Sequence, residues 1–225
     1  MPYDVFITGA TGYMGRTLGD ALLARGHRVR GLVRTGSEKR LGRGVEPVAG
    51  DALRAETFAA ALSPHDTLVH LVGTPHPSPW KAEEFRRVDL PSILASVSAC
   101  RERGVRHLVY VSVPQPSPVM KAYVAVRAEG EAAIRAAGLT ATVIRPLYVM
   151  GPGHRWPLLL VPFYWIAERL PSQREAALRL GLVTLDQMIA TLVRAIENPP
   201  APNTIRVIGA PEIRRRVDGS GTSTP

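Results

Sequence analysis

Short apolar runs alternate along the chain with stretches in which apolar positions recur at helical spacing. The apolar runs predict strands at about 3–8, 28–34, 45–49, 66–72, 106–112, 140–145 and 204–208. The other stretches predict helices at about 13–25, 55–62, 82–103, 119–137, 158–170 and 185–197. Most of the strands are continuously apolar, as burial on both faces of a sheet requires. The alternation predicts an α/β fold, with one parallel sheet covered by helices on both faces.

A glycine-rich loop, GATGYMG at positions 9–15, joins the first predicted strand to the first predicted helix. Strand, glycine turn and helix is the arrangement that holds a dinucleotide pyrophosphate at a helix N-terminus. Gly9 allows the tight turn, Gly12 lets the backbone approach the phosphates, and Gly15 lets the helix pack against the strand. The alternative is a turn that binds nothing. We predict a Rossmann-type cofactor site that includes Gly9, Thr11, Gly12, Tyr13, Met14 and Gly15.

The end of the second predicted strand bears on the choice of cofactor. About twenty residues after the glycine loop, NAD-binding proteins place a carboxylate that binds the ribose hydroxyls. Arg34 stands there instead, and Lys39 and Arg40 follow it. A guanidinium can form a fork with the 2′-phosphate of NADP and stack on the adenine. The alternative is that these are exposed loop charges, but the missing carboxylate predicts NADP rather than NAD.

Two further strand ends carry candidate cofactor contacts. Asp51 either accepts a hydrogen bond from the adenine or caps a helix that begins near Arg54. Gly73 lies at the edge where ligands bind in open α/β sheets, before a proline-rich loop, 75–79, that is either a connector or part of a substrate wall. The predicted cofactor site therefore also contains Asp51, Ala52, Val72 and Gly73.

The long helix predicted at 82–103 contains Asp89 beside Pro91, which predicts a kink or a helix start there. We predict one buried stripe on this helix, formed by Val88, Ile93, Leu94, Val97 and Cys100. Cys100 is the only cysteine, so an intramolecular disulfide is excluded. We interpret it as a small core residue rather than a reactive thiol.

Three polar residues form a candidate proton-donating set. Ser112 ends the fifth predicted strand, and Tyr123 and Arg127 lie four residues apart on one helix face. The serine can orient a substrate carbonyl, the tyrosine can donate a proton, and a cation beside the tyrosine stabilises the phenolate. From spacing alone, the interpretation favoured over this one is a strand-end serine, a half-buried core tyrosine and a solvated arginine.

Length and charge limit the other classes of function. The 225 residues suffice for one substantial core, and the net charge is +9. The basic residues are scattered and no aromatic residues interleave with them, so we do not expect nucleic-acid binding. The longest apolar stretch, 158–167, is too short to span a bilayer, and the first residues carry no secretory signal pattern. We expect a cytoplasmic protein with a small-molecule substrate and predict no metal site.

These motifs resemble the short-chain dehydrogenase/reductase superfamily, in its atypical NAD(P)H-binding group related to NmrA-like proteins and the 39-kDa subunit of complex I. The resemblance covers about residues 1–155 and rests on the glycine loop, Arg34, Gly50-Asp51, Val111-Ser112, Tyr123-x-x-x-Arg127-Ala128-x-x-Glu131, 138–140 and 144–153. It implies a Rossmann-type, doubly wound parallel sheet and an NAD(P)(H) cofactor. It also implies that Pro146 passes along the nicotinamide end.

The resemblance also exposes one departure. In active relatives a lysine follows the tyrosine by four residues and binds the nicotinamide ribose, whereas this chain has Arg127. An arginine keeps the charge but cannot shuttle a proton. Two functions are therefore open: an NADP-dependent oxidoreductase acting on a small apolar carbonyl or quinone, and a non-catalytic NADP(H)-binding regulator or assembly factor. Epimerase or dehydratase chemistry on a nucleotide sugar fits poorly, because that group usually has a larger C-terminal domain.

We expect three regions along the chain: a cofactor-binding core over 1–155, a segment over 156–211 that completes the same domain, and an unstructured tail over 212–225. The apolar helix at 158–170 is predicted first as a substrate pocket or lid, second as an oligomer contact and third as a membrane-surface segment. A quinone or another lipid-like substrate is a hypothesis that rests on this stretch. The sequence does not indicate an oligomeric state.

Overall fold

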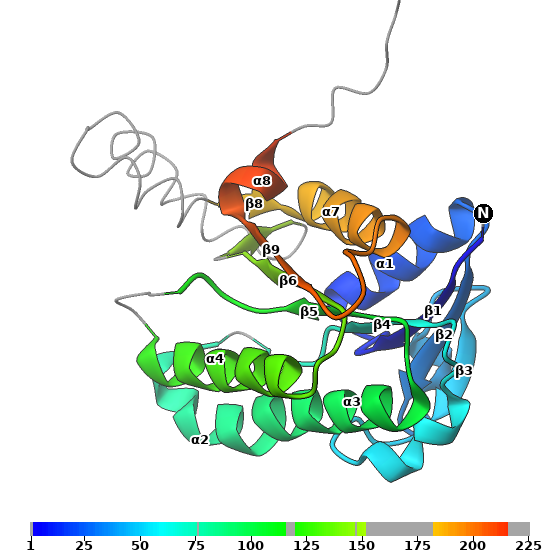
Figure 1. Cartoon of the computed structure of the whole chain (residues 1–225), viewed down its shortest axis with the longest axis horizontal. Helices are drawn as coiled ribbons and strands as arrows, with labels where there is room; N and C mark the ends of the chain where they lie inside the picture. Colours follow the sequence, from blue (N-terminus) through cyan, green and yellow to red (C-terminus); the bar gives the residue numbers. More distant parts are fainter. Residues whose placement is uncertain (1, 76, 116–119, 147, 152–181, 216–225) are drawn as a thin grey trace, which may run out of the picture.

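The computed structural model describes residues 2–75, 77–115, 120–146, 148–151 and 182–215. A seven-stranded parallel sheet, in the order β3-β2-β1-β4-β5-β6-β9, forms its centre (Figure 1). The strands are β1 (Asp4–Thr8), β2 (Arg28–Val33), β3 (Glu46–Ala49), β4 (Thr67–His70), β5 (His107–Val111), β6 (Ala141–Arg145) and β9 (Ile205–Gly209). The strand order reverses between β1 and β4, and ligands bind at such a point, beyond the carboxyl ends of the strands.

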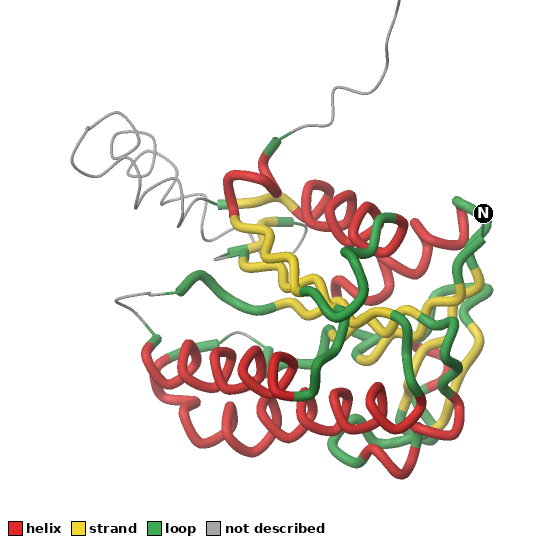
Figure 2. Tube along the Cα trace, in the orientation of Figure 1, coloured by secondary structure: helices red, strands yellow, loops and turns green. Residues whose placement is uncertain are grey.

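Helices cover both faces of the sheet (Figures 1 and 2). On one face, α1 (Tyr13–Ala24) packs against α7 (Leu185–Glu197). On the other face, α3 (Leu90–Arg103) packs against α4 (Lys121–Ala136). A π-helical turn, η5 (Phe85–Asp89), joins α3 to the short α2 (Ala82–Glu84). The shorter elements are η1 (Glu38–Arg40), η2 (Ala55–Thr57), η3 (Ala59–Ala61), η4 (Pro79–Lys81), the parallel pair β7 (Val149–Met150) and β8 (Val183–Thr184), and α8 (Ala210–Arg214).

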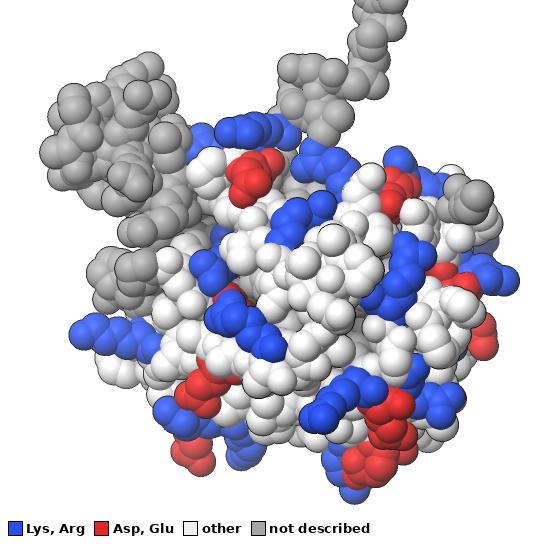
Figure 3. Space-filling view, in the orientation of Figure 1, with Lys and Arg blue, Asp and Glu red and all other residues white. Residues whose placement is uncertain are grey.

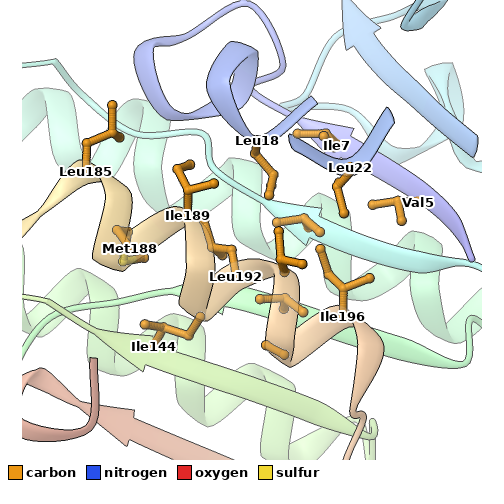
Figure 4. Close-up of a cluster of buried hydrophobic side chains, with 14 of the residues drawn as sticks. Val5, Ile7, Leu18, Leu22, Ile144, Leu185, Met188, Ile189, Leu192 and Ile196 are labelled. Atoms are coloured by element: carbon orange, nitrogen blue, oxygen red, sulfur yellow. The ribbon is translucent and has the colours of Figure 1, made fainter. Parts of the chain in front are cut away.

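Each face of the sheet has its own core. Val5 and Ile7 point from β1 toward α1 and α7, where they meet Leu18, Leu22 and Leu192 (Figure 4). The side chain between them, that of Phe6, belongs to the other core, with Phe58, Leu68, Ile93 and Tyr110. Because successive side chains of a strand point to opposite faces, a strand covered on both sides is mostly apolar along its whole length. This explains the continuous apolar runs of the sequence.

The sequence prediction of an α/β fold with a doubly wound parallel sheet is confirmed. The seven predicted strands and the helices 13–25, 119–137 and 185–197 appear within a few residues of their expected ends. The helix predicted at 55–62 is wrong, because this stretch forms the two 3₁₀ turns η2 and η3. Leu94 was wrongly assigned to the buried stripe of α3, since it is 43% exposed, whereas Cys100 is fully buried in the core as predicted.

Two further predictions concern the C-terminal third of the chain, and neither is confirmed. The predicted helix at 158–170 lies outside the described residues. The predicted tail begins too early, because α8 extends to Arg214 and buries Ile213. On the face shown in Figure 3, lysine and arginine side chains are spread among acidic ones rather than gathered in one patch. In the described part of the chain, no helix is long and apolar enough to cross a membrane.

Candidate active site

The glycine loop forms a tight turn between β1 and α1. Gly9 has φ +79°, and a Cβ there would lie 2.8 Å from the carbonyl carbon of Leu71, the residue that follows β4. The backbone N–H of Gly12 donates to the carbonyl oxygen of Gly9 over 3.0 Å, which closes the turn. A Cβ at Gly15 would overlap the backbone of Gly9 and Ala10. The loop therefore needs glycine for the turn itself and for the close packing of α1 on β1.

The N-terminus of α1 fits a phosphate group. Gly12 is its N-cap and supplies no side-chain hydrogen bond, and the first turn holds no acidic side chain. In an α-helix the first backbone N–H groups have no acceptor within the helix, and here they belong to Tyr13, Met14 and Gly15. These groups and the helix dipole favour an anion above the glycine turn. A dinucleotide pyrophosphate fits this donor set, and Gly12 leaves room for it.

Two cavities extend from the glycine loop in opposite directions. The smaller one, of about 400 Å³, lies toward β2 and β3, and the larger one, of about 630 Å³, lies toward β5 and α4. Both are lined by Gly9, Gly12, Leu71, Val72 and Gly73, so they meet over the glycine loop and the segment that follows β4. Together they form one crevice along the carboxyl edge of the sheet.

The smaller cavity contains the residues expected around an adenosine. Arg34 lies exposed at its edge, and Asp51 lines it. The carboxylate of Asp51 accepts from the backbone N–H of Leu53 over 3.0 Å and lies 3.7 Å from Nε of Arg54. It does not cap the segment after Arg54, so the capping alternative is wrong. The lining residues that belong to this cavity and not to the larger one are Thr11, Leu32, Val33, Arg34, Gly50, Asp51, Ala52, Leu53 and Val88.

The larger cavity is lined mostly by apolar groups and brings Tyr123 and Arg127 together. Tyr123 is half-buried, and its ring centroid lies 4.8 Å from that of Phe85 in the π-helical turn. The guanidinium carbon of Arg127 lies 5.0 Å from the centre of the Tyr123 ring. The lining residues not shared with the smaller cavity are Tyr13, Met14, Gly15, Thr74, Pro75, Pro77, Ser78, Val111, Tyr123, Arg127, Tyr148 and Val149.

Arg127 is held by the fold and is not the solvated arginine of the alternative interpretation. It is only 5% exposed, its Nη2 donates to Oδ1 of Asp89 over 2.7 Å, and its Nη1 donates to the carbonyl oxygen of Val111 over 3.1 Å. Burial opposes the charged form, but Tyr123, Tyr110 and Asp89 outweigh it and raise the pKa of the guanidinium. The cavity therefore has a permanent, ion-paired cation in its wall.

Ser112 and Pro146 are not placed in this cavity. Ser112 is 3% exposed, and its hydroxyl donates to Oε1 of Glu131 over 2.7 Å. Glu131 is fully buried and also accepts from Nε of Arg145 over 3.0 Å. Pro146 is buried as well, and neither residue is part of the described lining. Of the three predicted proton-donating residues, the structure thus brings together Tyr123 and Arg127.

Sequence reasoning missed two polar residues beside the cavity, Thr74 and Asp89. The sequence predicts only a kink or a helix start at Asp89, but its carboxylate binds both Thr74 and Arg127. Its position between Val88 and Leu90, in a helix that packs on the sheet, was the available signal. A carboxylate that becomes buried between two such apolar neighbours requires a partner.

The fold and the glycine loop define a Rossmann-type dinucleotide-binding protein. A family profile described as NAD(P)H-binding matches residues 9–153. The chain belongs to this NAD(P)H-binding family, as an atypical short-chain dehydrogenase/reductase with reductase-like relatives. This confirms the family resemblance seen in the sequence at the level of the superfamily.

Curated relatives are reductases of different compounds. The chain is 31% identical to a ceramide reductase of Caulobacter vibrioides over 200 residues. This match covers 87% of this chain and 61% of the relative. It is 29% identical over 168 residues to a 4-hydroxy-2-methyl-3-oxo-4-farnesyl-3,4-dihydroquinoline-1-oxide ketoreductase of Stigmatella aurantiaca, which covers 65% of this chain and 50% of the relative. The chain therefore spans between half and about three fifths of the length of these two relatives.

Solved structures confirm the fold. The UDP-glucose 4-epimerase of Thermus thermophilus in complex with NAD superposes with a TM-score of 0.63 at 21% identity, over 93% of this chain and 80% of the epimerase. The UDP-N-acetylglucosamine 4-epimerase of Bacillus cereus gives a TM-score of 0.66 at 16% identity, over 92% of this chain and 78% of that enzyme. At these identities the likeness concerns the fold alone.

Proposed function

We propose that this chain binds NADP(H) and reduces the carbonyl group of a small apolar or lipid-like substrate. The observation that carries the proposal is the larger cavity, which joins the glycine loop to Tyr123 through mostly apolar walls. A cofactor bound across the glycine loop would place one of its two halves in this cavity. Among the described residues that line the crevice, this cavity combines the phenol of Tyr123 with the buried cation of Arg127.

Arg34 supports NADP over NAD within this proposal. It is exposed at the edge of the smaller cavity, and no acidic residue follows β2 before Glu38. A guanidinium is suited to bind a phosphate on the adenosine ribose. Asp51 lies in the same cavity, within reach of an adenine, although its carboxylate already holds the backbone of Leu53.

Tyr123 is the proposed proton donor. NADPH, when bound, would supply the hydride that reduces the substrate carbonyl, and the protein would have to supply a proton to the carbonyl oxygen. The Tyr123 hydroxyl is the proposed source of that proton, and the Arg127 cation beside its ring stabilises the phenolate that remains. Ser112 can orient the carbonyl only if its hydroxyl turns away from Glu131. Arg127 keeps its charge and thus acts by its field rather than by proton transfer.

The apolar character of the larger cavity supports a substrate with little polarity. Its walls include Met14, Val72, Pro75, Val111 and Val149, which offer contact area but few hydrogen bonds. Two relatives carry names of apolar or lipid-like compounds, a ceramide and a farnesylated dihydroquinoline. A quinone or a long-chain ketone is accordingly the proposed substrate class.

A second candidate function is a non-catalytic NADP(H)-binding regulator or assembly factor. The ion pair between Arg127 and Asp89 favours it, because a guanidinium that is already engaged has fewer donors for a cofactor ribose. Both candidates share the cofactor site, a cytoplasmic location and the likeness to NmrA-like proteins. They differ only in whether turnover occurs.

The test combines cofactor binding with turnover. Thermal unfolding is measured with NADPH and with NADH, and a ligand at one hundred times its Kd should stabilise the protein by about 2.7 kcal/mol. NADPH oxidation is then followed with long-chain ketones, quinones and small polar ketones. The proposal expects preference for NADPH and turnover of an apolar carbonyl that is lost in Tyr123→Phe but kept in Tyr3→Phe, a tyrosine whose hydroxyl bonds Glu197 far from the crevice. Tight NADPH binding without turnover would favour the second candidate, and preference for NADH would overturn the assignment of Arg34.

A further inference from the structure

Asp89 connects three segments that surround the larger cavity. It ends the π-helical turn η5, and its side chain is fully buried. Oδ1 accepts from Nη2 of Arg127 over 2.7 Å. Oδ2 accepts from the backbone N–H of Thr74 over 3.0 Å and from the Thr74 hydroxyl over 2.6 Å. One carboxylate therefore fixes α4 and the turn after β4 against the helix that carries it.

Arg127 also lies close to Gly73, in the turn after β4. A Cβ on Gly73 would lie 2.5 Å from Nη2 of Arg127 and 3.3 Å from Oδ1 of Asp89. Gly73 lines both cavities, and Thr74 and Arg127 line the larger one. The two groups that Asp89 holds are thus part of the wall that a cofactor would touch, whereas the described lining of the two cavities does not include Asp89 itself.

A carboxylate is the group that this arrangement requires. Burying an unpaired charge strongly destabilises a fold, and here the charge is compensated by a guanidinium and two further donors. An amide has one acceptor oxygen and one NH₂ donor. An asparagine at position 89 would therefore turn a donor toward either Arg127 or Thr74, which are both donors at this point.

We infer that Asp89 is a positioning residue for the cofactor crevice, which acts by holding Arg127 beneath Tyr123 and Thr74 in the cavity wall. Loss of its charge releases the guanidinium and the turn together, so the cofactor meets a less ordered wall. The effect on turnover rests on the proposed function, whereas the effect on cofactor binding does not depend on a reaction.

The experiment compares Asp89→Asn with Asp66→Asn. Asp66 is an equally buried carboxylate that pairs with Nη2 of Arg30 over 2.6 Å and accepts from the backbone of Ser63, at the opposite edge of the sheet. Both variants should unfold at a lower temperature than the wild type. NADPH Kd, measured by quenching of protein fluorescence, should rise about tenfold in Asp89→Asn and less than twofold in Asp66→Asn. Equal NADPH affinity in the two variants would overturn the inference.

A double-variant cycle shows whether Asp89 acts through Arg127. In the Arg127→Gln background, Asp89→Asn should raise the NADPH Kd by clearly less than the tenfold expected in the wild type, because only the contacts with Thr74 are left to lose. A tenfold effect that persists in this background would contradict the inference. The double variant leaves no unpaired buried charge, so it gives a folded sample even if Asp89→Asn alone does not fold. If turnover is found, kcat of Asp89→Asn should fall by a larger factor than KM rises. If none is found, the NADPH Kd values of the variants still decide whether Asp89 positions the crevice.

Discussion

The hydroxyl of Ser112 donates a hydrogen bond to Oε1 of Glu131 over 2.7 Å, between a strand end and a helix 19 residues away. Its single proton is therefore already used by a carboxylate that also binds Arg145 and Gln115. In this state Ser112 can accept a hydrogen bond but cannot donate one to a substrate carbonyl. Ser112 is thus bound into the core rather than presented to the cavity.

Ser112→Ala should accordingly act on stability more than on turnover. Loss of a buried hydrogen bond to a carboxylate should lower the free energy of unfolding by about 1.5–3 kcal/mol. We expect kcat/KM to fall less than tenfold, against at least about a hundredfold for Tyr123→Phe, which removes the proposed acid. Urea unfolding and steady-state rates for both variants check this. A loss of rate in Ser112→Ala as large as in Tyr123→Phe would mean that the hydroxyl leaves Glu131 during the reaction.

Arg34→Ser should change the choice of cofactor. Loss of the guanidinium at the edge of the smaller cavity should raise the NADPH Kd about tenfold and leave the NADH Kd nearly unchanged, because only NADPH carries the 2′-phosphate. Titration of both cofactors at constant ionic strength is the measurement. Arg101→Ser, an exposed arginine at the end of α3, is the control for loss of one positive charge. A parallel loss of affinity for NADH would argue against contact with the 2′-phosphate.

Gly73→Ala should disturb the wall shared by the two cavities. The new methyl carbon would lie 2.5 Å from Nη2 of Arg127, so the guanidinium or the turn must move. We expect the free energy of unfolding to fall by about 1–3 kcal/mol, as for other overpacked sites, and NADPH binding to weaken. Gly209→Ala is the matched control, since its Cβ would meet no described atom closer than 3.6 Å. Retention of NADPH affinity in Gly73→Ala would show that the wall tolerates this movement.

Acidification should destabilise the protein partly through His107. Burial, helped by Arg206, lowers the pKa of His107 to about 3, whereas an unfolded chain leaves it near 6.5. Between about pH 6.5 and pH 3 the unfolded state therefore binds a proton that the folded state does not, so the free energy of unfolding falls as pH falls. One such histidine contributes on the order of 1 kcal/mol per pH unit in this window.

Urea unfolding at several pH values checks the effect of His107. His107→Gln keeps a polar partner for Thr142, which His107 contacts over 3.0 Å, and should show a shallower loss of stability below pH 6.5. His65→Gln is the control, because His65 is exposed. An unchanged slope in His107→Gln would assign the acid sensitivity to other groups, including the buried His70.

The sequence predicted those parts of the site whose geometry is set by residues close together in the chain. The glycine loop lies between a strand and a helix, so backbone geometry alone sets its shape, and the structure places the loop as expected. The spacing of Tyr123 and Arg127 on one helix likewise placed both at one cavity. The roles of these residues in cofactor binding and turnover stay predictions.

Contacts between distant segments could not be predicted from spacing. Arg127 meets Asp89, which is 38 residues away, and this pair decides that the arginine is buried rather than solvated. Helical periodicity also failed at 55–62, because an alanine-rich stretch there follows the sheet in two short 3₁₀ turns instead of one helix. In both cases the tertiary arrangement overrides a local preference.

The floor of the crevice, meaning the lining that the two cavities share, lets one ligand occupy both cavities at once. A ligand that crosses Gly9 and Val72 has two parts tethered over one short span, so binding of either part raises the effective concentration of the other. Fragments that fill one cavity should bind far more weakly than the whole dinucleotide. A change at Arg34 or Tyr123 then affects one fragment, while a change at the shared floor weakens both and also the gain from their linkage.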